Sequence, residues 1–185
     1  MSRVHLISPQ EAPLSVRNYF ASGPPGPVVS SLAQVPELLK VTMPFVGQVL
    51  GSSFINFRTK EMVILRTSAL LDCRYCTCTH TVVAMQASLS HQQLQALRGE
   101  VAVADAFEAE KDRLLIRWTD VVARGSGRIS EELALEFQGY FDDEEMVELT
   151  LLVGATVMLN RYATALELPV AQEHLQILTA AGFST

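Results

Sequence analysis

Proline is concentrated at one end of this sequence of 185 residues, because seven of its eight prolines lie within the first 44 residues. A proline inside a helix removes a backbone hydrogen bond and clashes with the preceding turn, so the chain after residue 44 is free to form helices. Alternation of apolar and polar residues of the kind seen in strands is not sustained anywhere. We therefore predict an all-α fold, a bundle of about seven or eight helices.

Capping residues, glycines and prolines divide the chain into the expected helices. Pro36 is expected to open the first helix, and Pro44 is expected to break or kink it before a second piece that runs through Leu50. Start and stop signals place further helices over residues 60–71, 72–87, 91–98, 105–124, from 130 onward, 143–166 and 169–182.

The length of the chain fits one domain over residues 1–185. Residues 1–35 are rich in Pro, Gly and Ser and are expected to form a loosely structured N-terminal arm of that domain. Hydrophobic residues make up 49% of the sequence, which excludes a disordered chain and supplies enough apolar surface for a sizeable core.

Charge and hydropathy exclude two classes of partner. The net charge of −6 argues against general nucleic-acid binding, which requires a basic surface to neutralise phosphates. The longest apolar run of the second half, Leu149 to Leu159, falls well short of the ~20 residues that a membrane-spanning helix needs. The first residues contain no apolar stretch of the signal-peptide type, so we expect a cytoplasmic protein that binds neither nucleic acid nor membrane.

All three cysteines of the chain lie within six residues, as Cys73, Cys76 and Cys78. Such a cluster in a reducing compartment indicates metal or redox chemistry more often than a structural disulfide. On a helix, Cys73, Cys76 and His80 share one face because they are spaced by three and four residues. Cys78 would point away from that face and is expected to be a packed bystander.

The helix that contains these cysteines is expected to begin near Asp72, which places Cys73 in its first turn. Unpaired backbone N–H groups and the positive end of the helix dipole favour a thiolate there, and the thiolate is the reactive form of cysteine. Two cysteines at this spacing can also form a disulfide after one of them has reacted. His80, one turn further on, can accept or return a proton near neutral pH.

Glu61 can join this group only if the chain folds back near Leu71 and Asp72. In one straight helix, Glu61 and Cys76 would be ~22 Å apart along the axis. In a hairpin with its turn at Leu71, Glu61 and His80 would lie at similar heights, ~15 and ~13 Å from the turn. The hypothesis is that a Glu61–His80 pair, in direct contact or through water, relays a proton to Cys76.

The pattern of Glu61, Cys73, Cys76 and His80 resembles the alkylhydroperoxidase D-type branch of the carboxymuconolactone decarboxylase family. In both, a Glu stands twelve positions before a C-x-x-C-x-x-x-H motif. The resemblance extends over about residues 36–98 and, more faintly, to Asn160 and Arg161. It departs at Tyr75, because the best-known peroxidases of this type carry a His directly before the second cysteine.

The resemblance implies an alkylhydroperoxidase D-like helical fold, a homo-oligomer built as a trimer or a multiple of three, and peroxide reduction. By the resemblance Cys76 is the peroxidatic thiol and Cys73 the resolving thiol, while Glu61 and His80 relay protons. The implied partners are a peroxide substrate and a dithiol or thioredoxin-like reductant. No metal, haem or flavin cofactor is implied. Lactone decarboxylation is not expected, because the decarboxylase branch lacks the cysteine pair.

Several other interpretations of the cysteine motif remain open. Structural zinc usually needs a second pair of ligands, and His5, His91 and His174 are all remote in sequence. The pair can also be incidental, or it can act as a non-catalytic redox sensor or in a binding module. A member of the same family with different chemistry is the remaining alternative.

Overall fold

The computed structural model describes residues 2–51 and 53–185, and none of these residues forms a β-strand. The predicted all-α class is therefore confirmed. The described helices are a 3-10 helix and ten α-helices, more than the seven or eight expected: η1 Leu14–Phe20, α1 Pro27–Leu32, α2 Pro36–Leu50, α3 Phe57–Leu70, α4 Arg74–Ala84, α5 His91–Arg98, α6 Val103–Ala106, α7 Glu110–Ala123, α8 Glu131–Gln138, α9 Asp143–Ala165 and α10 Gln172–Ala180.

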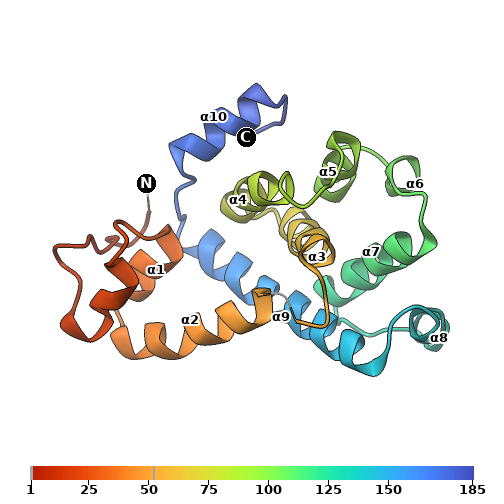
Figure 1. Cartoon of the computed structure of the whole chain (residues 1–185), viewed down its shortest axis with the longest axis horizontal. Helices are drawn as coiled ribbons and strands as arrows, with labels where there is room; N and C mark the ends of the chain where they lie inside the picture. The colour runs from red at the N-terminus through yellow and green to blue at the C-terminus, as the bar shows by residue number, and fades with distance from the viewer. Residues whose placement is uncertain (1, 52) are drawn as a thin grey trace.

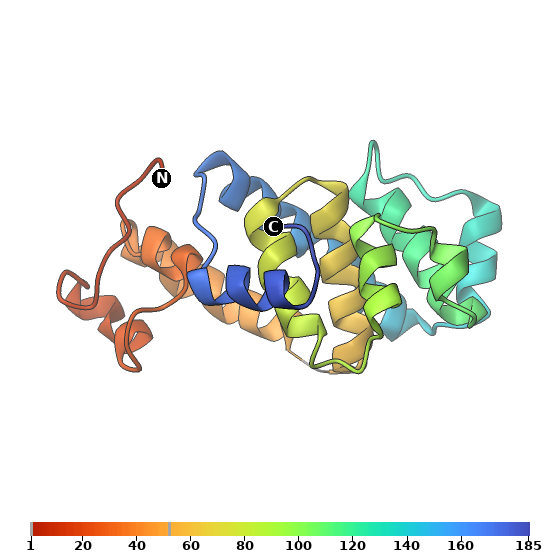
Figure 2. The ribbon, with the colours of Figure 1, turned by 90° about the horizontal axis from the view of Figure 1, so that it is seen from above.

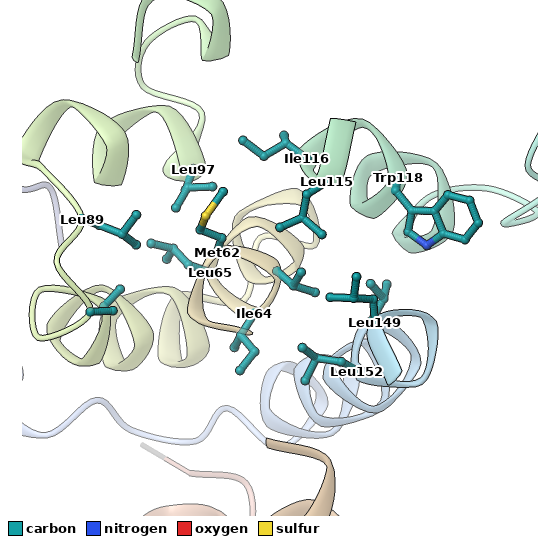
Figure 3. Close-up of a cluster of buried hydrophobic side chains, with 14 of the residues drawn as sticks. Met62, Ile64, Leu65, Leu89, Leu97, Leu115, Ile116, Trp118, Leu149 and Leu152 are labelled. Carbon is teal, nitrogen blue, oxygen red and sulfur yellow. The ribbon is translucent and has the colours of Figure 1, made fainter. Parts of the chain in front are cut away.

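Helix α3 is the centre of the molecule. It contacts α4, α5, α7 and α9, which surround it in Figure 1. Consecutive residues from Lys60 to Leu65 are all buried, so α3 has no face fully open to solvent. Figure 3 shows Met62, Ile64 and Leu65 of this helix among apolar side chains from its neighbours.

Helix boundaries differ from the prediction where tertiary packing outweighs local signals. Helix α2 continues through Pro44, and its buried residues Leu39 and Val46 lie on either side of the proline. The helix expected over residues 105–124 is split into α6 and α7. Phe107 lies between them in an extended conformation and is 1% exposed, so the chain leaves the helix to bury this side chain.

The N-terminal arm is more regular than predicted, because η1 and α1 both lie within residues 1–35. Apolar residues of this segment form a cluster with Leu39 of α2. Ser31 lies 2.9 Å from the Tyr162 hydroxyl of α9, and the backbone N–H of Arg3 donates to the Leu166 carbonyl at 2.9 Å. The arm lies at one end of the molecule and α8 at the other (Figures 1 and 2).

Helix α10 closes the chain by packing against α4, as Figure 2 shows. It begins at Gln172, three residues later than expected from Pro169. The segment before it buries Leu168 and Val170. None of the helices formed by residues 2–51 and 53–185 combines the length and apolar character needed to cross a bilayer.

Candidate active site

The candidate site is built on a helical hairpin of α3 and α4. Asp72 connects the two helices with a φ of +52°, a left-handed conformation that reverses the chain within a few residues. The two helices are in contact and lie side by side in Figure 1. The break expected near Leu71 and Asp72 is present, so side chains before and after it can meet.

Glu61 and His80 meet across this hairpin. Nδ1 of His80 lies 3.0 Å from Oε2 of Glu61, within hydrogen-bond distance. The Glu61 side chain is 6% exposed and the His80 side chain 21% exposed. A carboxylate at one ring nitrogen fixes the orientation of an imidazole and leaves the other nitrogen, Nε2, as the one that can exchange a proton with a third group.

Cys73 and Cys76 lie at the start of α4. Cys73 is the N-cap of the helix, and its Sγ accepts a hydrogen bond of 3.3 Å from the backbone N–H of Cys76. A disulfide joins the two residues, whose Cα atoms are 5.3 Å apart. In the reduced protein, the N-cap position favours the thiolate of Cys73, because backbone N–H groups point at its sulfur.

Cys78 lies on a different face of α4 and is buried in the main core with Met62 and Leu65. Cys73 and Cys76 belong to a separate apolar cluster that includes Leu168. Burial raises the pKa of the Cys78 thiol above its usual value, which disfavours the reactive thiolate. The structure therefore separates Cys78 from the other two cysteines, as predicted.

Cys76 and His80 both line a cavity of about 150 Å³. Its wall is largely apolar, with side chains from α1, α2, α3 and α9: Val28, Met43, Val46, Leu50, Ile64 and Leu159. Tyr75 also lines it, and burial raises the pKa of this phenol, so it is a neutral hydroxyl near pH 7. The cavity therefore places one sulfur and one imidazole beside a space for a small, mostly apolar molecule.

Cys73 lines a second hollow, of about 520 Å³, formed by the start of α4, the end of α9 and the segment that leads to α10. Its wall is more polar than that of the cavity at Cys76, with Arg74, Thr164 and Glu167 among its residues. Tyr75 lines both spaces. The two cysteines therefore contribute to two different hollows, with Tyr75 between them.

Asn160 is a cavity residue that sequence reasoning placed only at the edge of the family resemblance. Its side chain is 1% exposed, lines the cavity with Cys76 and His80, and donates from Nδ2 to the Thr156 carbonyl at 2.6 Å. The sequence signal for Asn160 is its amide side chain, which directly follows a long apolar run in one helix.

Among the described residues, no three or more His, Cys, Asp or Glu side chains converge as a metal site.

The sequence around this site is similar to that of a known protein family. Residues 36–117 match the family model described as the carboxymuconolactone decarboxylase family. The chain resembles this family across its central helices. The resemblance inferred from the Glu61–His80 motif is therefore confirmed, and the matched segment contains the whole α3–α4 hairpin.

Relatives and solved structures extend the similarity beyond the matched segment. An uncharacterized protein of Bacillus subtilis, YdfG, is 26% identical over 138 residues, which cover 75% of this chain and 92% of that protein. An alkylhydroperoxidase core structure, a peroxidase-related protein from Ralstonia eutropha, has 17% identity and a TM-score of 0.82, with 94% of each chain covered.

The debrominase Bmp8, solved as a cysteine-to-alanine variant with 2,3,4-tribromopyrrole, has 16% identity and a TM-score of 0.79. That comparison covers 98% of this chain and 100% of the debrominase. Likeness at these identities establishes the alkylhydroperoxidase D-like fold. One of these solved structures is described as peroxidase-related and another as a debrominase, so the fold alone does not determine the reaction.

Proposed function

We propose that the protein is a thiol-dependent peroxidase, which reduces peroxides through the Cys73/Cys76 pair with Glu61 and His80 as a proton relay. The observation that carries the proposal is the Glu61–His80 contact of 3.0 Å at a cavity that Cys76 also lines. A sulfur nucleophile, a proton carrier and a second sulfur in disulfide distance are the groups that peroxide reduction by thiols requires.

In the proposed cycle, the Cys76 thiolate attacks one oxygen of the peroxide. The S–O bond forms as the O–O bond breaks, and the departing oxygen takes a proton from His80, which leaves Cys76 as a sulfenic acid. The Cys73 thiolate then attacks the Cys76 sulfur, which forms the disulfide as the S–O bond breaks; the departing hydroxide takes a proton from solvent and leaves as water. An external dithiol reduces that disulfide by exchange and is itself oxidised.

The direct test is peroxide consumption by the purified protein with dithiothreitol as the reductant. Sustained consumption supports the peroxidase. A disulfide that forms with peroxide but gives no turnover favours the redox sensor instead.

Two further experiments test the other interpretations. The likeness to Bmp8 makes debromination of a bromopyrrole the second reaction to assay. Zinc analysis of protein purified under reducing conditions tests the metal interpretation.

The relay makes a prediction for Glu61 and His80. Glu61→Gln and His80→Asn are each expected to slow oxidation of the reduced protein by peroxide by about 10²-fold, a typical value for losing a positioned acid or base. Stopped-flow kinetics of a single oxidation measure this step. A matched pair serves as control, because His5 and Glu11 lie 2.9 Å apart on the surface. Full oxidation rates in Glu61→Gln would contradict the relay.

The hollow beside Cys73 offers the reductant its own approach, distinct from the peroxide cavity. We predict that Thr164→Trp, which fills part of this hollow from an exposed position of α9, slows reduction of the disulfide by dithiothreitol about tenfold or more without slowing its formation. Thr150→Trp, at an exposed position of the same helix, is the control. Equal reduction rates in the two variants would exclude this approach.

The homo-oligomer implied by the resemblance stays a prediction. It is supported by large apolar side chains that are exposed on α2 and α9, among them Val41, Phe45, Val147 and Leu151. The cytoplasmic location expected from the sequence also stays a prediction.

A further inference from the structure

Asn160 has a hydrogen-bonding group that the protein leaves without a partner. The residue is 1% exposed, and its Oδ1 is buried and accepts no hydrogen bond from any of the described residues. Its Nδ2 donates to the Thr156 carbonyl one turn earlier in α9, at 2.6 Å. A buried acceptor without a partner destabilises a fold, so such a group in a cavity points to a ligand that donates a hydrogen bond.

The hydrogen bond to the Thr156 carbonyl fixes the orientation of the Asn160 amide. The Thr156 carbonyl is an acceptor, so the amide nitrogen must face it and the oxygen must face away. The residue lines the cavity that Cys76 and His80 also line, whose remaining wall is mostly apolar. The wall of this cavity therefore combines the Asn160 side chain, one sulfur and one imidazole, and Oδ1 is the atom of that amide left to accept a hydrogen bond.

We propose that Oδ1 of Asn160 accepts the hydrogen bond of the hydroxyl group of a hydroperoxide, R–O–O–H, and so presents that oxygen to Cys76. This inference rests on the proposed peroxidase function and assigns a substrate-positioning residue to it. The cavity of about 150 Å³ limits R to hydrogen or a small apolar group. The expected substrate class is therefore small hydroperoxides.

The proposed contact agrees with the bonds that form and break. Cys76 sulfur attacks the oxygen that carries the hydrogen, so the S–O bond forms while the O–O bond breaks and the O–H bond is kept. RO⁻ leaves with both electrons of the O–O bond and takes the proton of His80. Asn160 thus holds the same hydrogen in the substrate and in the sulfenic acid, while His80 serves the other oxygen.

The test separates oxidation from reduction in single-turnover experiments. Reduced protein is mixed with hydrogen peroxide or tert-butyl hydroperoxide, and separately the disulfide form is mixed with dithiothreitol. Asn160→Leu, which keeps the shape and removes the acceptor, is expected to slow oxidation by about 10–100-fold, the range for one lost hydrogen bond in a substrate site. Reduction is expected to change less than about twofold, because the dithiol does not use this contact.

A second variant guards against loss of folding. Asn160→Thr can donate to the Thr156 carbonyl, as Thr156 itself donates to the Leu152 carbonyl at 2.7 Å, but its oxygen then lies closer to the helix. The Asn160→Thr protein is expected to fold and still to be oxidised much more slowly than the wild-type protein. Thr119→Val, which removes a buried hydroxyl bonded to the Leu115 carbonyl in α7, is the control for burial alone.

Each outcome decides the proposal. Slower oxidation with normal reduction in both variants supports it. Wild-type oxidation rates in both variants overturn it, and so does an equal slowing of both half-reactions, which indicates a purely structural role. If no hydroperoxide oxidises the wild-type protein, the proposed function fails first, and this inference fails with it.

Discussion

Cys76→Ser is expected to abolish peroxide consumption, and Cys73→Ser is expected to leave a protein that reacts once and then stops. Cys76 lines the cavity with His80, which is why the proposed mechanism assigns the attack to its sulfur. Removing an attacking nucleophile lowers turnover by more than about 10³-fold. Without Cys73, the sulfenic acid on Cys76 has no resolving thiol and persists. Mass spectrometry of the peroxide-treated variants measures this, as one added oxygen on Cys76 in the Cys73→Ser protein.

Cys78→Ser is the matched control, because this thiol lies in the main core and outside the disulfide. It is expected to keep full turnover and the Cys73–Cys76 disulfide. Two results would contradict the assigned roles: turnover that survives in Cys76→Ser, or a stable oxygen adduct on Cys73 in the Cys76→Ser protein with none on Cys76 in the Cys73→Ser protein. The second result would exchange the roles of the two sulfurs. That exchange is worth testing because the N-cap position of Cys73 favours its thiolate as well.

Lys60→Met is expected to lower the free energy of unfolding by about 3–5 kcal/mol, as expected when one partner of a buried ion pair is removed. The Lys60 side chain is fully buried, and its Nζ lies 2.5 Å from Oε1 of Glu148. The same Nζ donates to the carbonyls of Val49, at 2.7 Å, and Gly51. Its loss leaves the Glu148 carboxylate without its ion-pair partner and the carbonyls at the end of α2 without this donor. Urea denaturation followed by circular dichroism measures the change.

The double variant Lys60→Met with Glu148→Leu is expected to recover much of the lost stability, because it removes the buried ammonium and its carboxylate partner together. Lys40→Met is the surface control, since Lys40 and Glu37 form an exposed pair at 3.0 Å, and it is expected to change stability by less than about 1 kcal/mol. A Lys60→Met protein as stable as the Lys40→Met protein would mean that the buried pair does not support the fold.

Local signals in the sequence predicted the parts of the fold that short-range chemistry determines. Ser90 and Asp142 both act as N-caps with capping boxes, and the helices after them begin where expected. The separation of Cys78 from the cysteine pair followed from helical spacing. The contact between Glu61 and His80 could be predicted from the sequence, because the two residues are almost equally far from the turn near Asp72 and a hairpin brings such residues to the same height.

Features that depend on distant packing could not be predicted in the same way. Lysine is normally a surface residue, and only the contacts of Lys60 with α9 and the end of α2 explain its burial. Phe107 interrupts a helix because the core accepts its ring, which no local pattern indicates. The order within residues 1–35 depends on α2 and α9, and the orphaned oxygen of Asn160 exists only in the assembled cavity.

In the proposed peroxidase cycle, the placement of Cys78 bears on which disulfide forms each time the protein is oxidised. Cys78 is two residues from Cys76 in sequence, yet it faces the main core with its thiolate disfavoured by burial. Helix α4 thus separates the Cys73–Cys76 pair from the buried thiol of Cys78. A disulfide between Cys78 and either of the other cysteines would require the helix to unwind, so we expect each proposed cycle to re-form the Cys73–Cys76 disulfide without an isomerase.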